Sequence, residues 1–255
     1  MAQSDQFNGR LGLIFASIGA AIGTGNIWRF PRMVGANGGG TFLIPWLIFL
    51  FAWSIPLVIA EFAMGKRSRT GTIGTFRIFA GKKFAWMGLW TAWISTAIGF
   101  YYAIVAGWTI KYFQLGITGG LTGEGVDTTE VWNSFLQNPG QVIFFQFIVI
   151  CLTLAAIWKG AKAIEKVNVV LMISLFVLLF MSLFLSLWMD FEDGTLDGAT
   201  FMFSVDPDLL FEPEIWINAL SQSAWSCSAG MGMAITYAVY MLSLIHISEP
   251  TRRYF

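Results

Sequence analysis

Long apolar stretches limit what this chain can fold into more than any other feature of its sequence. Six of them lie near residues 11–35, 41–65, 84–112, 141–158, 167–189 and 215–241. A helix needs about 20 mainly apolar residues to cross a lipid bilayer. Only 12% of the residues are charged, whereas soluble domains average about 25%. The sequence therefore predicts an all-α polytopic membrane protein, with the lipid bilayer as its surroundings.

The loops between these stretches alternate in charge. The loop between the second and third stretches has only basic charged residues, which are Lys66, Arg67, Arg69, Arg77, Lys82 and Lys83. The loop at residues 190–214 has only acidic ones. Because basic loops stay on the cytoplasmic side, residues 1–10 are predicted to be a cytoplasmic N-terminus and residues 190–214 an extracellular loop. The formal net charge of zero gives no sign of a nucleic-acid partner.

The first stretch is interrupted by glycine. Gly19, Gly23 and Gly25 are followed by Asn26 and Arg29. Each glycine costs about 1 kcal/mol of helix propensity relative to alanine, and an arginine in hydrocarbon costs about 3 kcal/mol or more. A broken helix explains both features, since its freed carbonyls suit sodium and its freed amides suit a carboxylate. The alternative is a small-residue packing face.

The sixth stretch has a similar interruption. Ser226, Ser228, Gly230 and Gly232 fall near its centre. Two interrupted spans predict a transporter whose binding site lies midway through the membrane. An intramembrane enzyme is disfavoured because the spans contain neither an HExxH nor a GxSxG motif, so no catalytic residue is predicted.

The motif at the first interruption resembles the neurotransmitter:sodium symporter family. The resemblance rests on residues 23–31 (GTGNIWRFP) and 37–40 (NGGG). Further matches are residues 59–65 (IAEFAMG), 100–102 (FYY) with Trp108, 162–166 (KAIEK), and 228–232 (SAGMG) with Thr236 and Tyr237. It implies the first five-helix repeat of an inverted-repeat transporter fold at residues 11–189, followed by a discontinuous sixth helix at 215–241. It also implies sodium-coupled symport of a small amino acid-type substrate by alternating access, in the plasma (inner) membrane.

The resemblance implies residue roles as well. One sodium site would use the Ala21 carbonyl, the Asn26 side chain and the Ser226 hydroxyl, completed by the substrate carboxylate. A second sodium site would use the carbonyls of Gly19 and Ile22. The amides of Thr24 and Gly25 and the hydroxyl of Tyr102 would hold that carboxylate. Ile98, Trp225, Ser228 and Met231 would line the pocket, and Arg29 and Gln222 would belong to the extracellular gate.

Gly23 bears on the class of substrate. Monoamine carriers of the family have an acidic residue at the matching position, where this chain has no side chain. The substrate is therefore expected to bring its own carboxylate, as an amino acid does. The choice between aliphatic and aromatic amino acids stays open.

Three other residues or pairs in the spans attract attention. Glu61 is an acid within the second span, where a structural or gating hydrogen bond is expected. Tyr101 and Tyr102 point in different directions on a helix, so at most one is expected to face the site. Trp28 is expected to pack rather than bind.

The end of the chain departs from the family pattern. Residues 242–255 resemble the translation of a sequencing-library adapter. The chain is therefore expected to be an N-terminal fragment cut in the sixth span and inactive alone. A natural half-transporter, acting as a structural or regulatory membrane subunit, is the alternative.

Overall fold

The structure is a computed structural model that describes residues 14–15, 17–19, 22, 25–122, 125–193 and 197–240. Throughout these ranges the regular structure is helical and contains no strand. This confirms the all-α prediction.

Four helical runs among these residues are long and apolar enough to cross a membrane. They are Gly40–Ser68, Lys82–Thr118, Pro139–Ile157 and Ala163–Met189. They overlap the second to fifth predicted stretches. The sixth stretch, and the part of the first that the structure describes from Gly25 onward, contain only shorter helices.

The first of these runs contains a wide turn. It consists of α3 (Gly40–Phe49), the π-helical turn η2 (Leu50–Ser54) and α4 (Ile55–Ser68). Pro56 lies at the start of α4. Because proline lacks an N–H, the regular hydrogen bond to the preceding turn cannot form there, and the wider turn accommodates it.

The middle of the chain forms long helices joined by short capped ones. α5 (Thr72–Phe79) and the 3-10 turn η3 (Lys82–Phe84) lead into α6 (Ala85–Thr118). Asp127 caps the N-terminus of α7 (Thr128–Leu136), and its carboxylate accepts from the Thr129 amide at 2.8 Å. α8 (Pro139–Ile157) begins with proline at its first turn, and Asn138 Oδ1 accepts from the Gln141 amide at 3.2 Å. These are ordinary N-terminal signals of helices.

The last part of the chain returns to the first helices. α9 (Ala161–Asp193) and α10 (Asp197–Phe203) lead through η4 (Leu209–Phe211) to α11 (Pro213–Cys227) and α12 (Met233–Val239). α11 packs on α3, and α12 packs on α4. Phe42 and Ala219 are fully buried between α3 and α11, together with Val34 of α2 (Phe30–Ala36) and Ile215.

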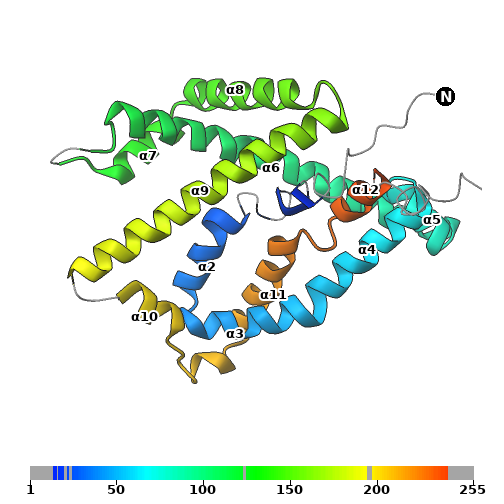
Figure 1. The fold of residues 1–255 in the computed structure, drawn as a ribbon, viewed down its shortest axis with the longest axis horizontal. Helices are drawn as coiled ribbons and strands as arrows, with labels where there is room; N and C mark the ends of the chain where they lie inside the picture. Colours follow the sequence, from blue (N-terminus) through cyan, green and yellow to red (C-terminus); the bar gives the residue numbers. More distant parts are fainter. Residues whose placement is uncertain are drawn as a thin grey trace, which may run out of the picture.

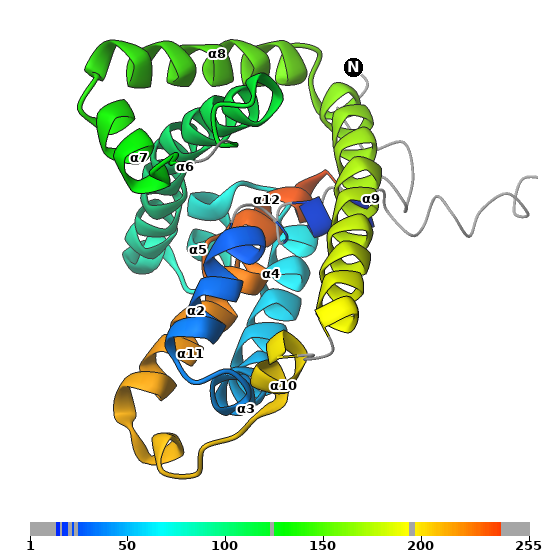
Figure 2. The ribbon, with the colours of Figure 1, turned by 90° about the vertical axis from the view of Figure 1, so that its left-hand side faces the viewer.

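The helices form two groups with α9 beside them (Figures 1 and 2). One group contains α2, α3, α4 and α11, and the other contains α6, α7 and α8. In Figure 2, α9 stands as a separate column along one edge. Many large apolar side chains on α8 and α9 are exposed, among them Phe147, Phe180 and Trp188. Such outward apolar faces suit contact with lipid.

Candidate functional site

The interruption in the sixth stretch is a connection between two short helices. α11 ends at Cys227, and Ser228 has the left-handed φ of 54°. Gly230 and Gly232 also have positive φ angles, of 78° and 71°, before α12 begins at Met233. A non-glycine residue at positive φ is strained, so surrounding contacts must hold Ser228 in place. The predicted discontinuity of this helix is confirmed.

Contacts from three elements hold this connection. Glu61 of α4 is 6% exposed, and its Oε1 accepts from the Gly232 amide at 3.4 Å. The Ser95 hydroxyl of α6 donates to the Met231 carbonyl. The Thr72 and Thr91 methyl groups leave no room for a Cβ at Gly232. Glu61 therefore has the structural hydrogen bond expected from the sequence.

The π-helical turn that follows the first predicted interruption lies next to the end of α11. Asn26 is in the π-helical turn η1 (Gly25–Arg29), and its Nδ2 donates to the Ser226 carbonyl at 3.0 Å. The Ser226 hydroxyl accepts from Gln222 Nε2 at 3.3 Å. The contact between Asn26 and Ser226 joins residues 200 positions apart in the sequence.

Several predicted ligands cannot be placed at this contact. Ala21, Gly23 and Thr24 lie outside the described residues. Gly25 begins the π-helical turn, and Ile22 is helical and half-buried. Gly19 lies against α9, where a Cβ would be 3.5 Å from Met172 Sδ.

Arg29 lies where the two interrupted segments meet. Its Nη1 donates to Gln222 Oε1, and its Nη2 donates to the Ser221 hydroxyl at 3.3 Å. Its Cζ lies 5.6 Å from the centre of the Trp225 ring, within cation–π range. Gln222 is fully buried. The structure thus brings together the two predicted gate residues, Arg29 and Gln222.

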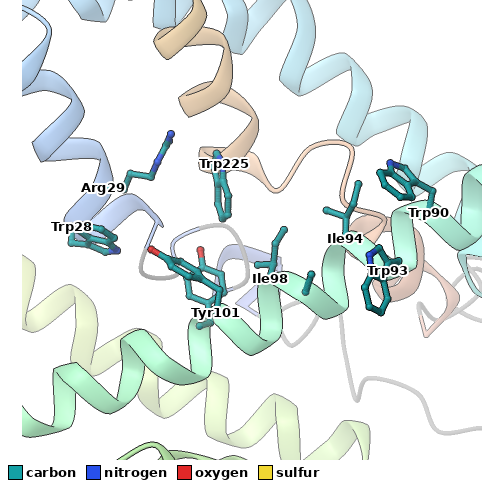
Figure 3. Close-up of a pocket in the computed structure, with 10 residues that line it drawn as sticks. Trp28, Arg29, Trp90, Trp93, Ile94, Ile98, Tyr101 and Trp225 are labelled. Atoms are coloured by element: carbon teal, nitrogen blue, oxygen red, sulfur yellow. The ribbon is translucent and has the colours of Figure 1, made fainter. Parts of the chain in front are cut away.

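A cavity of about 420 Å³ lies beside this arginine (Figure 3). Its walls come from η1, α6 and α11: Trp28, Arg29, Trp90, Trp93, Ile94, Ala97, Ile98, Tyr101, Tyr102 and Trp225. In Figure 3, Trp225 and Ile98 point toward each other from α11 and α6. The rings of Tyr102 and Trp225 meet edge to face at 6.3 Å. The cavity is therefore aromatic, with one cation at its edge.

Sequence reasoning assigned four of the ten wall residues to the site and missed six. Ile98, Tyr102 and Trp225 were predicted at the substrate and Arg29 at the gate, but the α6 residues before Ile98 were not predicted. Trp90, Trp93, Ile94 and Ala97 precede it at helical spacing, one face of a helix. Extending that face backward from Ile98 would have found them.

The expectation for the two neighbouring tyrosines was wrong. Tyr101 and Tyr102 both line the cavity, although at most one was expected to. Neighbouring helical residues point about 100° apart, and this cavity spans a wide enough arc of α6 to reach both. Trp28, expected to pack rather than bind, packs against Arg32, whose Cζ lies 6.0 Å from its ring centre, and is also part of the cavity wall.

Met231 borders a different cavity from Ile98. This second cavity, of about 350 Å³, is lined by Thr72, Ala92, Ser95, Gly232, Met233, Thr236 and Tyr237 as well as Met231. Ser228 is buried and does not line the first cavity. The structure therefore separates these two residues from the aromatic cavity to which the sequence assigned them.

Two oxygen-bearing side chains at the junction are of the kind that hard cations take as ligands. The Asn26 side chain and the Ser226 hydroxyl are neutral oxygen donors, and hard cations take oxygen ligands. Within the described ranges, no group of three or more His, Cys, Asp or Glu residues could hold a metal ion.

Comparison with known proteins agrees with these features. The sodium:neurotransmitter symporter family matches residues 4–137 and 133–246. The sodium-dependent transporter YhdH of Bacillus subtilis (strain 168) is 31% identical over 243 residues, covering 92% of this chain and 52% of that protein. The sodium-dependent neutral amino acid transporter B(0)AT2 of Mus musculus is 27% identical, covering 92% of this chain and 36% of that protein.

A solved structure is also similar. The crystal structure of MhsT in complex with L-phenylalanine matches with a TM-score of 0.83 and 35% sequence identity. The match covers 93% of this chain and 54% of that chain. This chain therefore spans about half the length of the bacterial relative and of this solved structure.

Proposed function

Because this chain belongs to the sodium:neurotransmitter symporter family, we propose that it supplies the first helical repeat and the sixth span of a sodium-coupled amino acid symporter. The observation that carries the proposal is the junction of the two interrupted segments through Asn26 and Ser226, beside an aromatic cavity with Arg29 at its edge. A cation at the edge of an aromatic cavity, beside a discontinuous helix, suits a substrate with its own carboxylate.

The cavity walls favour a neutral amino acid with an apolar side chain. Trp225, Tyr102 and Ile98 offer apolar surface, and the single cation Arg29 would disfavour a basic side chain. A similar neutral amino acid transporter and the phenylalanine-bound MhsT support this substrate class.

One sodium ion would be held by Asn26 and Ser226, together with Ala21 and the substrate carboxylate. The Asn26 Oδ1 atom would be the ligand, because an amide oxygen binds a hard cation and an amide nitrogen does not. The second sodium site would use Gly19 and Ile22. Residues 1–10 would be cytoplasmic and residues 190–214 extracellular, in the plasma (inner) membrane.

The test replaces Asn26 by alanine in the protein encoded by the full open reading frame, as read from the genomic gene that contains this sequence. Binding of radiolabelled L-phenylalanine and L-leucine would be measured against sodium concentration. We expect Asn26→Ala to raise the half-saturating sodium concentration about tenfold. Loss of one ligand or hydrogen bond costs about 1.4 kcal/mol, which corresponds to a tenfold change in affinity.

Asn133→Ala is the matched control, because Asn133 is exposed on α7, away from the junction. It should leave sodium dependence unchanged. Equal sodium dependence in wild type and Asn26→Ala would contradict the assigned sodium site. Binding that needs no sodium at all would contradict the proposed function.

The alternative is a half-length membrane subunit. This alternative also fits, because the chain covers about half the length of the relatives it matches. Sequencing the gene across codon 242 separates the two. A frame that continues into further apolar spans supports the symporter, and a stop codon after residue 255 supports the subunit.

A further inference from the structure

The short helix α5 has polar side chains inside and apolar side chains outside. Thr75 is fully buried and Thr72 is 9% exposed, whereas Ile73 is 45% and Ile78 is 57% exposed. A surface helix in water has the opposite arrangement. Whatever faces the outer side of α5 must therefore be partly apolar.

The buried threonines explain why the helix lies this way round. Thr75 Oγ1 donates to the Thr70 carbonyl at 3.0 Å and lies 2.7 Å from the Ser68 hydroxyl. The Thr72 methyl group packs against Gly232. These contacts fix the inner face of α5 and leave the isoleucines pointing outward.

Basic and aromatic side chains lie beside these isoleucines. Arg77, Lys82 and Lys83 are exposed, and none of the three forms an ion pair or hydrogen bond with a described residue. Trp86 is 62% exposed. Residues 66–86 contain no acidic side chain. We call Ile73, Arg77, Ile78, Lys82, Lys83 and Trp86 the α5 surface.

The position of α5 in the chain places this surface at the edge of the membrane. One apolar run, Gly40–Ser68, ends just before α5, and the next, Lys82–Thr118, begins just after it. Figure 1 shows α5 at one end of the molecule, beside the end of α4. A short segment joining two spans lies at the membrane surface.

We propose that the α5 surface lies in the headgroup region of the bilayer and binds anionic phospholipids. Its isoleucines enter the boundary of the acyl chains, as the apolar face of an interfacial helix does. Trp86 suits the headgroup level, and the three cations complement the negative lipid charge. This property does not depend on transport and goes beyond the proposed symport.

Lipid retention tests the proposal on the 255-residue chain purified in a neutral detergent. Native mass spectrometry would compare bound phosphatidylglycerol with phosphatidylcholine. We expect preferential binding of phosphatidylglycerol, and K82Q/K83Q should weaken it about fivefold for each lysine removed.

The matched control is K159Q/K166Q, since these two lysines are also exposed, one between α8 and α9 and the other in the first turns of α9. It should retain phosphatidylglycerol to within about twofold of wild type. Equal binding of both lipids by the wild-type chain would overturn the proposal. An equal loss in both double variants would overturn the assignment to α5.

A depth measurement tests the apolar half of the proposal without a lipid-binding assay. A spin label at Ile78, in a chain with Cys151 and Cys227 replaced by alanine, would be compared with one at Asn133. In vesicles of phosphatidylcholine and phosphatidylglycerol, the label at residue 78 should collide more with oxygen and less with a water-soluble nickel chelate. Equal nickel accessibility at both positions would overturn the proposal. Protection from both reagents in a dimeric chain would assign the surface to a second copy, and would also overturn it.

Discussion

The guanidinium of Arg29 is contacted by neutral polar groups and an aromatic ring in this structure. Its guanidinium contacts the Gln222 amide oxygen, the Ser221 hydroxyl and the Trp225 ring. None of the described acidic residues forms an ion pair with it. A cation held in this way can still attract a substrate carboxylate. Arg29 thus links the predicted gate to the aromatic cavity.

Tyr102 and Tyr101 provide a matched pair for testing this site. Both line the cavity, but the family resemblance assigns only the Tyr102 hydroxyl to the substrate carboxylate. Loss of a hydrogen bond to a charged group costs about 1.5–3 kcal/mol. In the genomic reading frame, we expect Tyr102→Phe to weaken sodium-dependent amino acid binding about tenfold or more, measured by scintillation proximity.

Tyr101→Phe should change that affinity by less than about twofold, because its ring stays in the wall. If the two variants lose the same affinity, the hydroxyl of Tyr102 has no special part in binding. A larger loss of affinity in Tyr101→Phe than in Tyr102→Phe would mean that Tyr101 holds the substrate carboxylate.

Glu61 is the second residue with a testable role. Its Oε1 accepts from the Gly232 amide at 3.4 Å. Glu61→Ala would leave this buried amide without that acceptor, at a cost of about 1–3 kcal/mol. We expect a lower melting temperature and faster hydrogen exchange confined to residues 228–234.

Glu130→Ala, at an exposed position on α7, serves as the control for loss of a carboxylate. It should leave both measurements unchanged. Unchanged exchange at residues 228–234 in Glu61→Ala would mean that Ser95, Thr72 and Thr91 hold the connection without it.

At the scale of elements, the crossing of α4 and α12 depends on one glycine. A Cβ at Gly65 would overlap the Ile235 carbonyl, so the two helices can approach this closely only without a side chain there. The contact holds α12 against the second span. It is the same pairing that places Glu61 near Gly232.

Gly65→Ala and Gly116→Ala should affect the melting temperature differently. Both glycines lie in helices, where alanine is favoured by about 0.5–1 kcal/mol. Gly116 has open space around it, so its substitution should leave the melting temperature unchanged or raise it. Gly65→Ala should lower it, because overpacking costs about 1–3 kcal/mol. Stabilisation by Gly65→Ala would contradict the close crossing.

At the scale of the whole molecule, the length of the chain matters for activity. It covers 52% of the bacterial relative and 54% of the solved structure. We therefore expect no sodium-driven uptake of L-phenylalanine or L-leucine by vesicles that contain only the 255 residues. Uptake that follows an imposed sodium gradient would show that these residues suffice.

Much of the fold could be predicted because its causes are local. Apolar length identifies the second to fifth spans, and the glycines and serines near residues 23 and 230 identify the interruptions. The family resemblance assigned Ile98, Tyr102 and Trp225 to the substrate pocket and Arg29 to the gate, and the structure places all four around one cavity. The rest of that cavity, above all Trp90 and Trp93, depends on which face of α6 turns toward α11.

Sequence patterns were enough to predict an all-α membrane protein with a discontinuous sixth span, because lipid permits few alternatives to long apolar helices and makes each exception visible. How distant segments meet was settled by the tertiary structure. It joined Asn26 to Ser226, moved Met231 to a separate cavity and turned the threonines of α5 inward. These outcomes depend on packing between elements far apart in the chain, and local periodicity carries no information about such packing.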